Sequence, residues 1–333
     1  MATRWGIASA GMISHDFVAA LRTLPSNEHK VVAVAARQLD RAKEFADDHN
    51  IPAAYGSYQD LANDPNIDVV YIGAIHPQHL SISKLMLEAG KHVLCEKPLT
   101  MNLKETKELV TLAKQKKLFL MEAVWSRCFP AYDVLRKELE AGTLGDVRQV
   151  IVNLGAPIQD MDRIKQKDLG GGAIMDMGVY CLQFAVMVFG ARLPDHIVAL
   201  GHLNSQGVDS DAAAILNYND GKTATLSINT NVSLPNEAIV LGTKGSAKVP
   251  YPFWSPSEVV ILDKTIQLPL PKTSHKFNYL NSIGLVYEAN EVRDCLKKGL
   301  LESPKMTHKE SMVISELEDI LRKQVGVKYL QDI

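Results

Sequence analysis

Cysteines are few in this 333-residue sequence, and the four present stand far apart. They are Cys95, Cys128, Cys181 and Cys295, and no two of them form a Cys-x-x-Cys pair. Such spacing argues against a zinc site and against a disulfide framework, so no metal is expected. Each cysteine lies in an apolar stretch, where we expect it to act as a small buried hydrophobic residue.

A strong charge of either sign is also lacking. The 36 Lys and Arg residues against 38 Asp and Glu residues give a formal net charge of -2, and the basic residues are spread along the chain. This balance gives no electrostatic reason for binding nucleic acid or an anionic membrane. The N-terminus runs directly into a strand-like segment, so no signal peptide is expected and a cytoplasmic location is the default expectation.

One long apolar stretch, residues 173–191, raises the question of a membrane span. It contains Asp176 and two glycines, Gly178 and Gly190. A charged side chain is costly in a bilayer, and the stretch therefore predicts a buried helix of a water-soluble protein.

The first third of the chain alternates short apolar runs with amphipathic segments. Continuous Val, Ile and Ala runs are typical of strands covered on both faces, so the pattern predicts an α/β domain with a parallel sheet over residues 1–124. The expected strands are 5–8, 31–36, 69–74, 92–95 and 119–121, and the expected helices are 13–24, 40–48, 81–89 and 103–116.

After about residue 123 the pattern changes, and strand-like runs dominate beyond Gly190. The links 219–221 and 243–245 contain Asn, Asp and Gly, which suit hairpin turns. Residues 125–333 therefore predict a C-terminal α/β domain for substrate binding and oligomerisation, with a large open, mostly antiparallel sheet. The expected strands are 147–154, 197–201, 212–218, 223–229, 238–241 and 259–262, and the expected helices are 131–141, 285–298 and 309–323.

A weak dinucleotide fingerprint follows the first expected strand. The frame Gly-x-Gly-x-x-Gly reads here as Ser9-x-Gly11-x-x-Ser14, with Met12 and Ile13 opening the helix. Small residues at the outer positions still allow the backbone to approach a pyrophosphate closely, as in a Rossmann-type, doubly wound sheet. An ordinary strand-to-helix turn remains the alternative.

The end of the second expected strand adds weight to the nucleotide hypothesis. Sheets that prefer NAD usually carry an acidic residue there, whereas this chain has Arg37, with Arg41 one helical turn further on. Arginine can bind a 2′-phosphate through charge-assisted hydrogen bonds. NADP is therefore the expected cofactor, and two solvated surface arginines are the alternative.

Two further segments carry candidate chemistry. Glu96-Lys97-Pro98 follows the strand 92–95, at the sheet edge where a nicotinamide would lie, although an isolated tripeptide of this kind is often a surface turn. The run Gly170-Gly171-Gly172 suits a backbone that passes close to another group. After this run, Asp176 and Tyr180 are four residues apart and are expected on one face of an otherwise apolar helix. The alternatives are a catalytic pair and a buried hydrogen-bonded pair.

These segments resemble the glucose-fructose oxidoreductase, inositol dehydrogenase and rhizopine-catabolism (Gfo/Idh/MocA) family. Residues 89–98 are similar to its strand and Glu-Lys-Pro loop, and residues 171–180 are similar to its second motif; the match runs essentially from end to end. Within the family, the chain resembles a branch that uses NADP to oxidise trans-dihydrodiols of aromatic hydrocarbons and D-xylose. The segments that carry this closer resemblance are 5–7, 32–37, 76–79, 242–245 and 277–284.

The resemblance implies Lys97 and Tyr180 as the catalytic pair, with Asp176 as a supporting partner. It implies that His79 lies beside the nicotinamide, and that Trp125 and Arg127 face the same cleft. The sequence departs from the family at Ser9, where glycine is usual, and at Ala74, where threonine is frequent. The full set of expected cofactor-binding residues is Ser9, Gly11, Met12, Ile13, Arg37, Arg41, Ala74, His76, His79, Glu96, Lys97, Trp125 and Arg127.

Aromatic residues supply candidates for an apolar substrate wall, although each could equally be an ordinary core residue. The expected substrate-binding residues are Trp125, Asp176, Tyr180, Trp254, Phe277 and Tyr279. The hypothesis is hydride transfer from a ring carbinol to nicotinamide, with Tyr180 as base. A free phenol has a pKa of about 10, and the Lys97 ammonium would stabilise the phenolate.

Two alternatives stay open. One is a dehydrogenase of the same family that acts on another sugar or a cyclitol. The other is a catalytically silent NADP-binding regulator, against which the presence of Lys97, Asp176 and Tyr180 argues. Members of the family often associate through the outer face of the C-terminal sheet, so a homodimer is expected.

Overall fold

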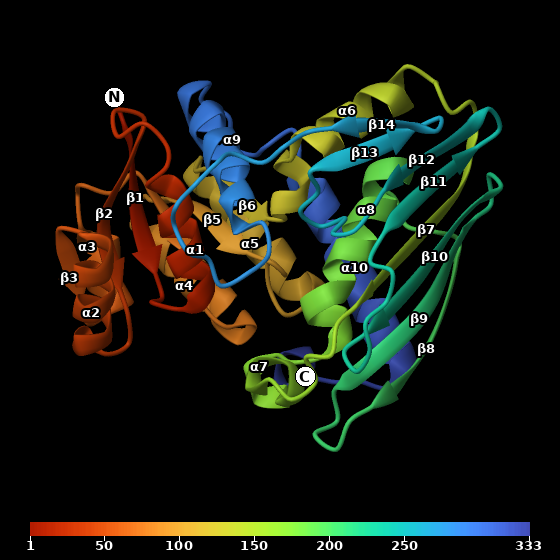
Figure 1. Cartoon of the computed structure of the whole chain (residues 1–333). Coiled ribbons are helices and arrows are strands. Elements are labelled where there is room, and N and C mark those ends of the chain that lie inside the picture. Colours follow the sequence, from red (N-terminus) through yellow and green to blue (C-terminus); the bar gives the residue numbers. More distant parts are fainter. The chain divides into compact units, whose positions relative to one another are not determined.

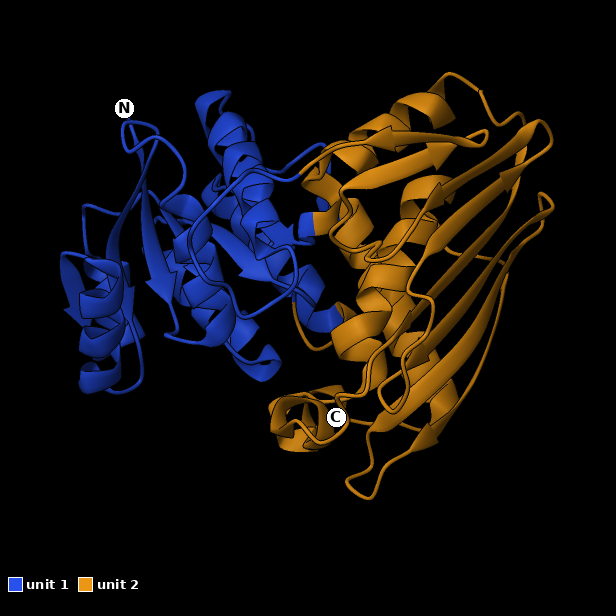
Figure 2. Ribbon diagram, viewed as in Figure 1, with its two compact units in different colours: residues 1–99, 104–125, 270–308 blue, residues 100–103, 126–269, 309–333 orange.

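The computed structural model describes all 333 residues, and the chain forms two compact units (Figures 1 and 2). Unit 1 comprises Met1–Leu99, Lys104–Trp125 and Leu270–His308. Unit 2 comprises Thr100–Leu103, Ser126–Pro269 and Lys309–Ile333.

Unit 1 contains the predicted parallel sheet, in the strand order β3-β2-β1-β4-β5-β6. All of its strand pairs are parallel, and strand order reverses beside β1, as in a doubly wound Rossmann sheet. The prediction for this sheet is confirmed, with β3 as an additional edge strand. The strands are β1 (Thr3–Ala8), β2 (His29–Ala35), β3 (Ala53–Tyr55), β4 (Val69–Ile72), β5 (His92–Glu96) and β6 (Leu120–Ala123).

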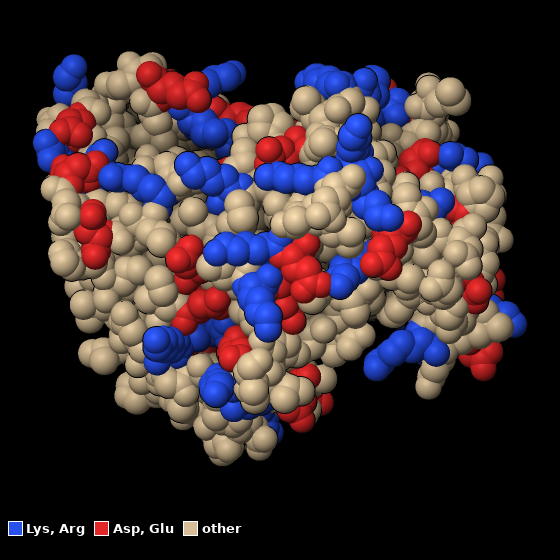
Figure 3. Space-filling model, turned by 180° about the vertical axis from the view of Figure 1, so that it is seen from behind, with Lys and Arg blue, Asp and Glu red and all other residues tan.

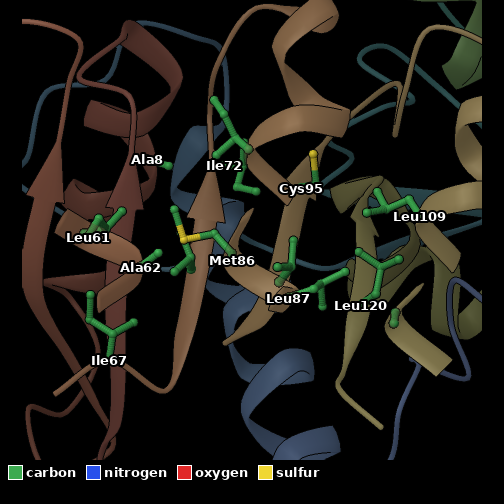
Figure 4. Packing of buried hydrophobic residues seen from close by; sticks show 14 of the residues in the cluster. Ala8, Leu61, Ala62, Ile67, Ile72, Met86, Leu87, Cys95, Leu109 and Leu120 are labelled. Atoms are coloured by element: carbon green, nitrogen blue, oxygen red, sulfur yellow. The ribbon is translucent and has the colours of Figure 1, made fainter. Parts of the chain in front are cut away.

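Helices cover this sheet and bury its apolar side chains. Figure 4 shows one such cluster, in which Ile72 and Cys95 of the sheet lie near Met86 and Leu87 of α4. Close packing of this kind fixes the strand ends, and so the loops that follow them. The helices of unit 1 are α1 (Met12–Leu21), α2 (Leu39–His49), α3 (Tyr58–Asn63), α4 (His79–Glu88), α5 (Leu103–Lys116) and α9 (Leu285–Lys297).

Helix α9 differs from the predicted division, which placed every residue after 124 in the second domain. It packs against α1. Arg293 Nη1 donates to Thr3 Oγ1 over 3.0 Å, and the Asn290 side chain contacts His29 Nε2 over 3.0 Å. An amphipathic pattern shows that a helix has a buried face but not which distant sheet buries it. No pattern in the sequence therefore indicated that the segment Leu270–His308 belongs to unit 1.

Unit 2 contains an eight-stranded sheet in the order β14-β13-β12-β11-β7-β10-β9-β8. Only β7 and β10 pair in parallel, so the sheet is mostly antiparallel, as predicted. Its strands are β7 (Val147–Gly155), β8 (His196–Leu203), β9 (Asp209–Tyr218), β10 (Lys222–Asn229), β11 (Ala238–Gly242), β12 (Gly245–Val249), β13 (Glu258–Ile261) and β14 (Lys264–Gln267). Its helices are α6 (Pro130–Glu140), α7 (Asp162–Lys165), α8 (Val179–Phe189) and α10 (His308–Val325).

The apolar stretch that contains α8 is a core helix of unit 2. The segment Lys167–Phe189 is apolar enough to cross a membrane by length and composition, but 83% of its most apolar window is buried inside the protein. This confirms the predicted buried helix. All four cysteines are buried, also as predicted, and none of them forms a disulfide.

Charged residues do not gather by sign on the face of the molecule in Figure 3. Lysine and arginine are interspersed there with aspartate and glutamate. This distribution agrees with the balanced formal charge of the sequence.

Candidate cofactor and catalytic site

The turn between β1 and α1 has open backbone at the start of a helix. Gly11 is the N-cap of α1, no side chain caps the helix, and its first turn has no acidic residue. A Cβ atom built on Gly11 would come no closer than 3.6 Å to Ser9 Oγ and 3.7 Å to the Gly73 carbonyl oxygen. Packing does not require glycine here, so the free space and the uncapped amides fit the close approach of a pyrophosphate.

Ser9 and Ser14 take the places of the outer fingerprint glycines. Ser9 has φ of 94°, a conformation that side chains disfavour and glycine adopts readily. Ser14 is fully buried beside Gly73. A Cβ atom built on Gly73 would collide with Ser14 Oγ. Between them, Met12 is exposed and Ile13 is partly buried. The frame of the predicted motif is thus present, with a small residue in each of its three positions.

The two predicted phosphate-binding arginines differ in their surroundings. Arg37 follows the end of β2 and is exposed, and it makes no ion pair. Arg41 lies in the first turn of α2 and forms an ion pair with Glu44 on the same helix. Arg37 is therefore the arginine with its guanidinium available to a ligand.

His79 connects two loops at the carboxyl edge of the sheet. It is fully buried, with Nδ1 2.8 Å from the Pro98 carbonyl oxygen and Nε2 3.0 Å from that of Ala74. Burial lowers the pKa of His79, so the ring is neutral and donates to one of these two oxygens. Both nitrogens face backbone, and His79 therefore positions the loops after β4 and β5. His76 lies with its ring centroid 5.7 Å from that of His79.

Glu96 ends strand β5, Lys97 follows it, and the Lys97–Pro98 peptide bond is cis. Tyr71, fully buried on β4, donates from its hydroxyl to Glu96 Oε1 over 2.5 Å. The Lys97 amide approaches Glu96 Oε2 at 3.3 Å. These contacts fix the carboxylate and the start of the loop, while the Lys97 side chain is partly exposed.

Trp125 and Arg127 belong to the 3-10 turn Trp125–Cys128, and both are buried. The Arg127 guanidinium donates from Nε to the Gln183 side chain, from Nη2 to the Gln183 carbonyl oxygen at 2.7 Å, and from Nη1 to Glu310 at 2.7 Å. All three of its nitrogens have protein acceptors. Its surroundings suit a structural role better than the predicted role in cofactor binding.

Asp176 lies in a π-helical turn, Ile174–Gly178, that leads into α8. Turns of this kind are uncommon and often occur at functional sites. The Asp176 side chain is 8% exposed and forms a 2.5 Å ion pair with Arg163. Tyr180, one helical turn later, is partly exposed. Sequence reasoning missed Arg163, because 13 residues separate it from its partner and no local pattern connects them.

The glycine run before this turn has the role that the sequence predicted. A Cβ on Gly171 would collide with the Ile164 carbonyl group, and Gly172 has φ of 118°. Asp209, also missed in the sequence, accepts from the Ile174 amide over 2.6 Å. The loop therefore packs backbone against its neighbours and starts the π-helical turn at a fixed place.

The remaining predicted aromatic residues are partly exposed and come from both units. Trp254, in unit 2, packs edge-on against Tyr251 and Phe253, with ring centroids 5.8 and 5.9 Å away. Phe277 and Tyr279 belong to the segment before α9 in unit 1. The Asp16 carboxylate on α1 accepts from the amides of Asn278 and Tyr279 at 2.8 and 2.9 Å, which fixes this segment over α1.

Comparison with known proteins identifies relatives over the whole chain. Residues 3–124 match the family described as an oxidoreductase family with an NAD-binding Rossmann fold, GFO/IDH/MocA, and residues 132–248 match the GFO/IDH/MocA C-terminal domain.

Two curated relatives and one solved structure illustrate the similarity. The trans-1,2-dihydrobenzene-1,2-diol dehydrogenases of Danio rerio and Sus scrofa are each 48% identical, over 100% of this chain and 99% of their own. A 3-ketoreductase from Actinomadura kijaniata, solved with NADP and TDP-benzene, is 26% identical with a TM-score of 0.81, over 99% of this chain and 100% of its own.

Proposed function

Because the chain belongs to the Gfo/Idh/MocA family of NAD(P)-dependent oxidoreductases, we propose that it oxidises trans-dihydrodiols of aromatic hydrocarbons with NADP. A trans-dihydrodiol substrate is proposed because the chain is 48% identical, over essentially its full length, to trans-1,2-dihydrobenzene-1,2-diol dehydrogenases. The products are catechols. D-xylose is proposed as a second substrate, oxidised to its lactone.

The preference for NADP over NAD rests on Arg37. Its exposed guanidinium follows the end of β2, the position at which a Rossmann sheet discriminates between a ribose hydroxyl and its phosphate. A planar guanidinium matches phosphate oxygens through two parallel hydrogen bonds. The uncapped start of α1 and the open space at Gly11 would hold the pyrophosphate.

The catalytic residues are proposed to be Lys97 and Tyr180, as the resemblance to the family implies. When bound, the nicotinamide supplies the acceptor for the hydride that leaves the carbinol carbon. Tyr180, as the phenolate that the Lys97 ammonium stabilises, accepts the hydroxyl proton of the substrate and becomes a neutral phenol. The ion pair between Arg163 and Asp176 holds the helical turn that presents Tyr180.

An absorbance assay of NADPH formation tests the function. The panel consists of trans-dihydrodiols, D-xylose, D-glucose and inositols, each with NADP and with NAD. We expect the highest kcat/KM for a trans-dihydrodiol with NADP. A higher value for an inositol or another sugar would replace the substrate, and binding of NADP without turnover of any compound would support a regulator instead.

We also propose a homodimer that forms through the outer face of the β8–β9 sheet edge. Val198 pairs directly with Ile215 across these strands, and Leu200 stands two residues further along β8. Their exposed fractions are 60%, 49% and 74%. A cluster of exposed apolar side chains commonly marks a protein interface. Light scattering should give twice the mass of the chain, and Leu200→Lys should lower it to one chain.

A further inference from the structure

The four residues Thr100–Leu103 belong to unit 2, although the strands before and after them, β5 and β6, belong to unit 1. They come directly after the loop that contains Lys97. The Asn102 side chain donates from Nδ2 to the Gln331 carbonyl oxygen over 2.8 Å and to Asp332 Oδ1 over 3.2 Å. The chain just after the Glu-Lys-Pro loop is therefore bound to the last residues of the protein.

These last residues, 327–332, form a C-terminal tail that buried side chains hold in one conformation. The Asp332 carboxylate accepts from the Tyr329 amide and from Arg322 Nη1, each over 2.9 Å. Arg322 Nη2 donates to the Met101 carbonyl oxygen over 3.0 Å, and the guanidinium carbon lies 4.9 Å from the centre of the Tyr329 ring. Arg322 and Tyr329 are each 2% exposed. Because a guanidinium binds its acceptors in a fixed planar geometry, these contacts determine where the tail lies.

The same tail contacts the glycine run that precedes the π-helical turn. The Tyr329 hydroxyl donates to the Gly171 carbonyl oxygen. A Cβ atom built on Gly172 would lie 2.5 Å from Asp209 Oδ1 and 3.0 Å from Tyr329 Oη. A side chain at this position would collide with the first atom and crowd the second, so the close approach of the tail requires glycine here. Figure 1 shows the C-terminus beside α7, the helix that leads to the glycine run.

An apolar cluster joins these segments to one another. Its five core members are each at most 5% exposed: Met101, Met175, Val208, Val327 and Tyr329. Met101 follows the Glu-Lys-Pro loop, Met175 belongs to the π-helical turn, and Val327 and Tyr329 belong to the tail. Closely packed interiors transmit displacements from one side chain to the next. A shift of the tail would therefore move the segments next to both catalytic motifs.

We propose that the C-terminal tail positions both catalytic motifs, the Glu-Lys-Pro loop and the π-helical turn before Tyr180, and that it acts through Asn102 and Tyr329. The inference rests on the proposed function, which assigns Lys97 and Tyr180 to catalysis. Asn102 and Tyr329 are positioning residues, since they act through the backbone of the two motifs and not by touching the substrate. Such residues affect the rate because a displacement of about 1 Å in a catalytic group can lower it about 10²-fold.

Two substitutions in the full-length protein each separate the tail from one motif. Tyr329→Phe keeps the buried ring and removes only the hydrogen bond to Gly171. Asn102→Ala removes both hydrogen bonds from the loop side chain to the tail. Leu330→Ala is the matched control, because Leu330 lies in the same tail but its side chain is 79% exposed.

Single-turnover kinetics distinguishes positioning from a structural role. With enzyme and NADP in excess over a trans-dihydrodiol, the rate constant of NADPH formation reports the steps up to hydride transfer and does not depend on the fraction of active protein. We expect Tyr329→Phe and Asn102→Ala each to lower this rate constant about tenfold, with an unchanged dissociation constant for NADP, and Leu330→Ala to match the wild type. A wild-type rate constant in both variants, with or without a loss of steady-state kcat, would overturn the proposal.

Hydrogen exchange of the cofactor-free protein tests the contacts without the reaction. Tyr329→Phe should speed amide exchange in residues 171–180, and Asn102→Ala in residues 98–103, while strand β1 exchanges as in the wild type. Unchanged exchange in these two segments would contradict the role of the tail at any level of activity. If the wild type forms NADPH from no substrate of the panel, the proposed function fails and the role of the tail in catalysis fails with it. If the wild type is active and both variants match it, only the role of the tail fails.

Discussion

The two units hold their proposed site residues by different means. In unit 1 the site depends on backbone: His79 faces the carbonyl oxygens of Ala74 and Pro98, and Gly11 leaves space beside uncapped amides. In unit 2 it depends on side chains: Asp176 is held by Arg163 within a π-helical turn. Substitutions in unit 2 should therefore change the chemical step, whereas substitutions in unit 1 should change cofactor binding or backbone stability.

The largest effect is expected at Tyr180. Tyr180→Phe removes the proposed base, and general base catalysis typically contributes about 10²–10⁴-fold, so kcat should fall by this order. The dissociation constant for NADP, measured by fluorescence titration, should stay unchanged. Tyr218→Phe is the control in the same unit, because the buried Tyr218 hydroxyl has no hydrogen-bond partner. Near-normal kcat in Tyr180→Phe would remove this residue from the base role.

A smaller effect, on cofactor choice alone, is expected at Arg37. Hydrogen bonds to a charged group contribute roughly 1.5–3 kcal/mol, so Arg37→Ala should lower kcat/KM for NADP by about 10- to 100-fold and leave that for NAD nearly unchanged. Arg41→Ala should lower kcat/KM for NADP less than Arg37→Ala does, because Arg41 already pairs with Glu44. Steady-state kinetics with both cofactors measures the two variants. A larger loss in Arg41→Ala would transfer the phosphate-binding role to that residue.

A weaker effect on kcat is expected at Arg163. Arg163→Ala leaves the buried Asp176 carboxylate without its ion pair, so the turn before Tyr180 should shift and kcat should fall about tenfold, which corresponds to about 1.4 kcal/mol in the barrier. Arg163→Lys should recover part of the loss. Binding of NADP should be unaffected in both variants. An equal loss in kcat and in thermal stability, with no rescue by lysine, would indicate a purely structural pair.

The smallest effect is expected from the backbone of unit 1. At Ser9, with φ of 94°, glycine relieves an unfavourable conformation, and Ser9→Gly should stabilise the protein by roughly 0.5–1 kcal/mol in a denaturant titration. Gly11→Ala is the contrasting variant. It should unfold like the wild type, because its Cβ meets only ordinary contacts, but it should bind NADP more weakly. Unchanged affinity would show that the pyrophosphate does not approach Gly11.

Much of the fold could be predicted from apolar patterning, because long periodic segments determine their own type. The short strands β3, β12 and β14 were missed, since three to five residues carry little periodicity. The placement of α9 was missed because its partner, α1, lies more than 260 residues earlier in the chain.

The proposed site could be predicted only where a motif is local. Lys97, Asp176 and Tyr180 stand in short, recognisable segments. The residues that hold them do not: Arg163 reaches Asp176 across 13 positions, and Tyr71 reaches Glu96 across 25. Such partners are brought together by the fold, and the sequence around each of them looks like that of an ordinary surface or core residue.

The return of residues Leu270–His308 to unit 1 has a consequence for biosynthesis. Domains usually fold in the order in which they leave the ribosome, at about 5–20 residues per second. Here the first sheet can form early, but the side of α1 that α9 covers stays exposed until nearly the whole chain has been translated. The nascent chain therefore presents an uncovered apolar surface for about 10–40 seconds, which makes it a substrate for chaperones. For the same reason, a fragment ending at residue 124 should be insoluble unless α9 is grafted onto it.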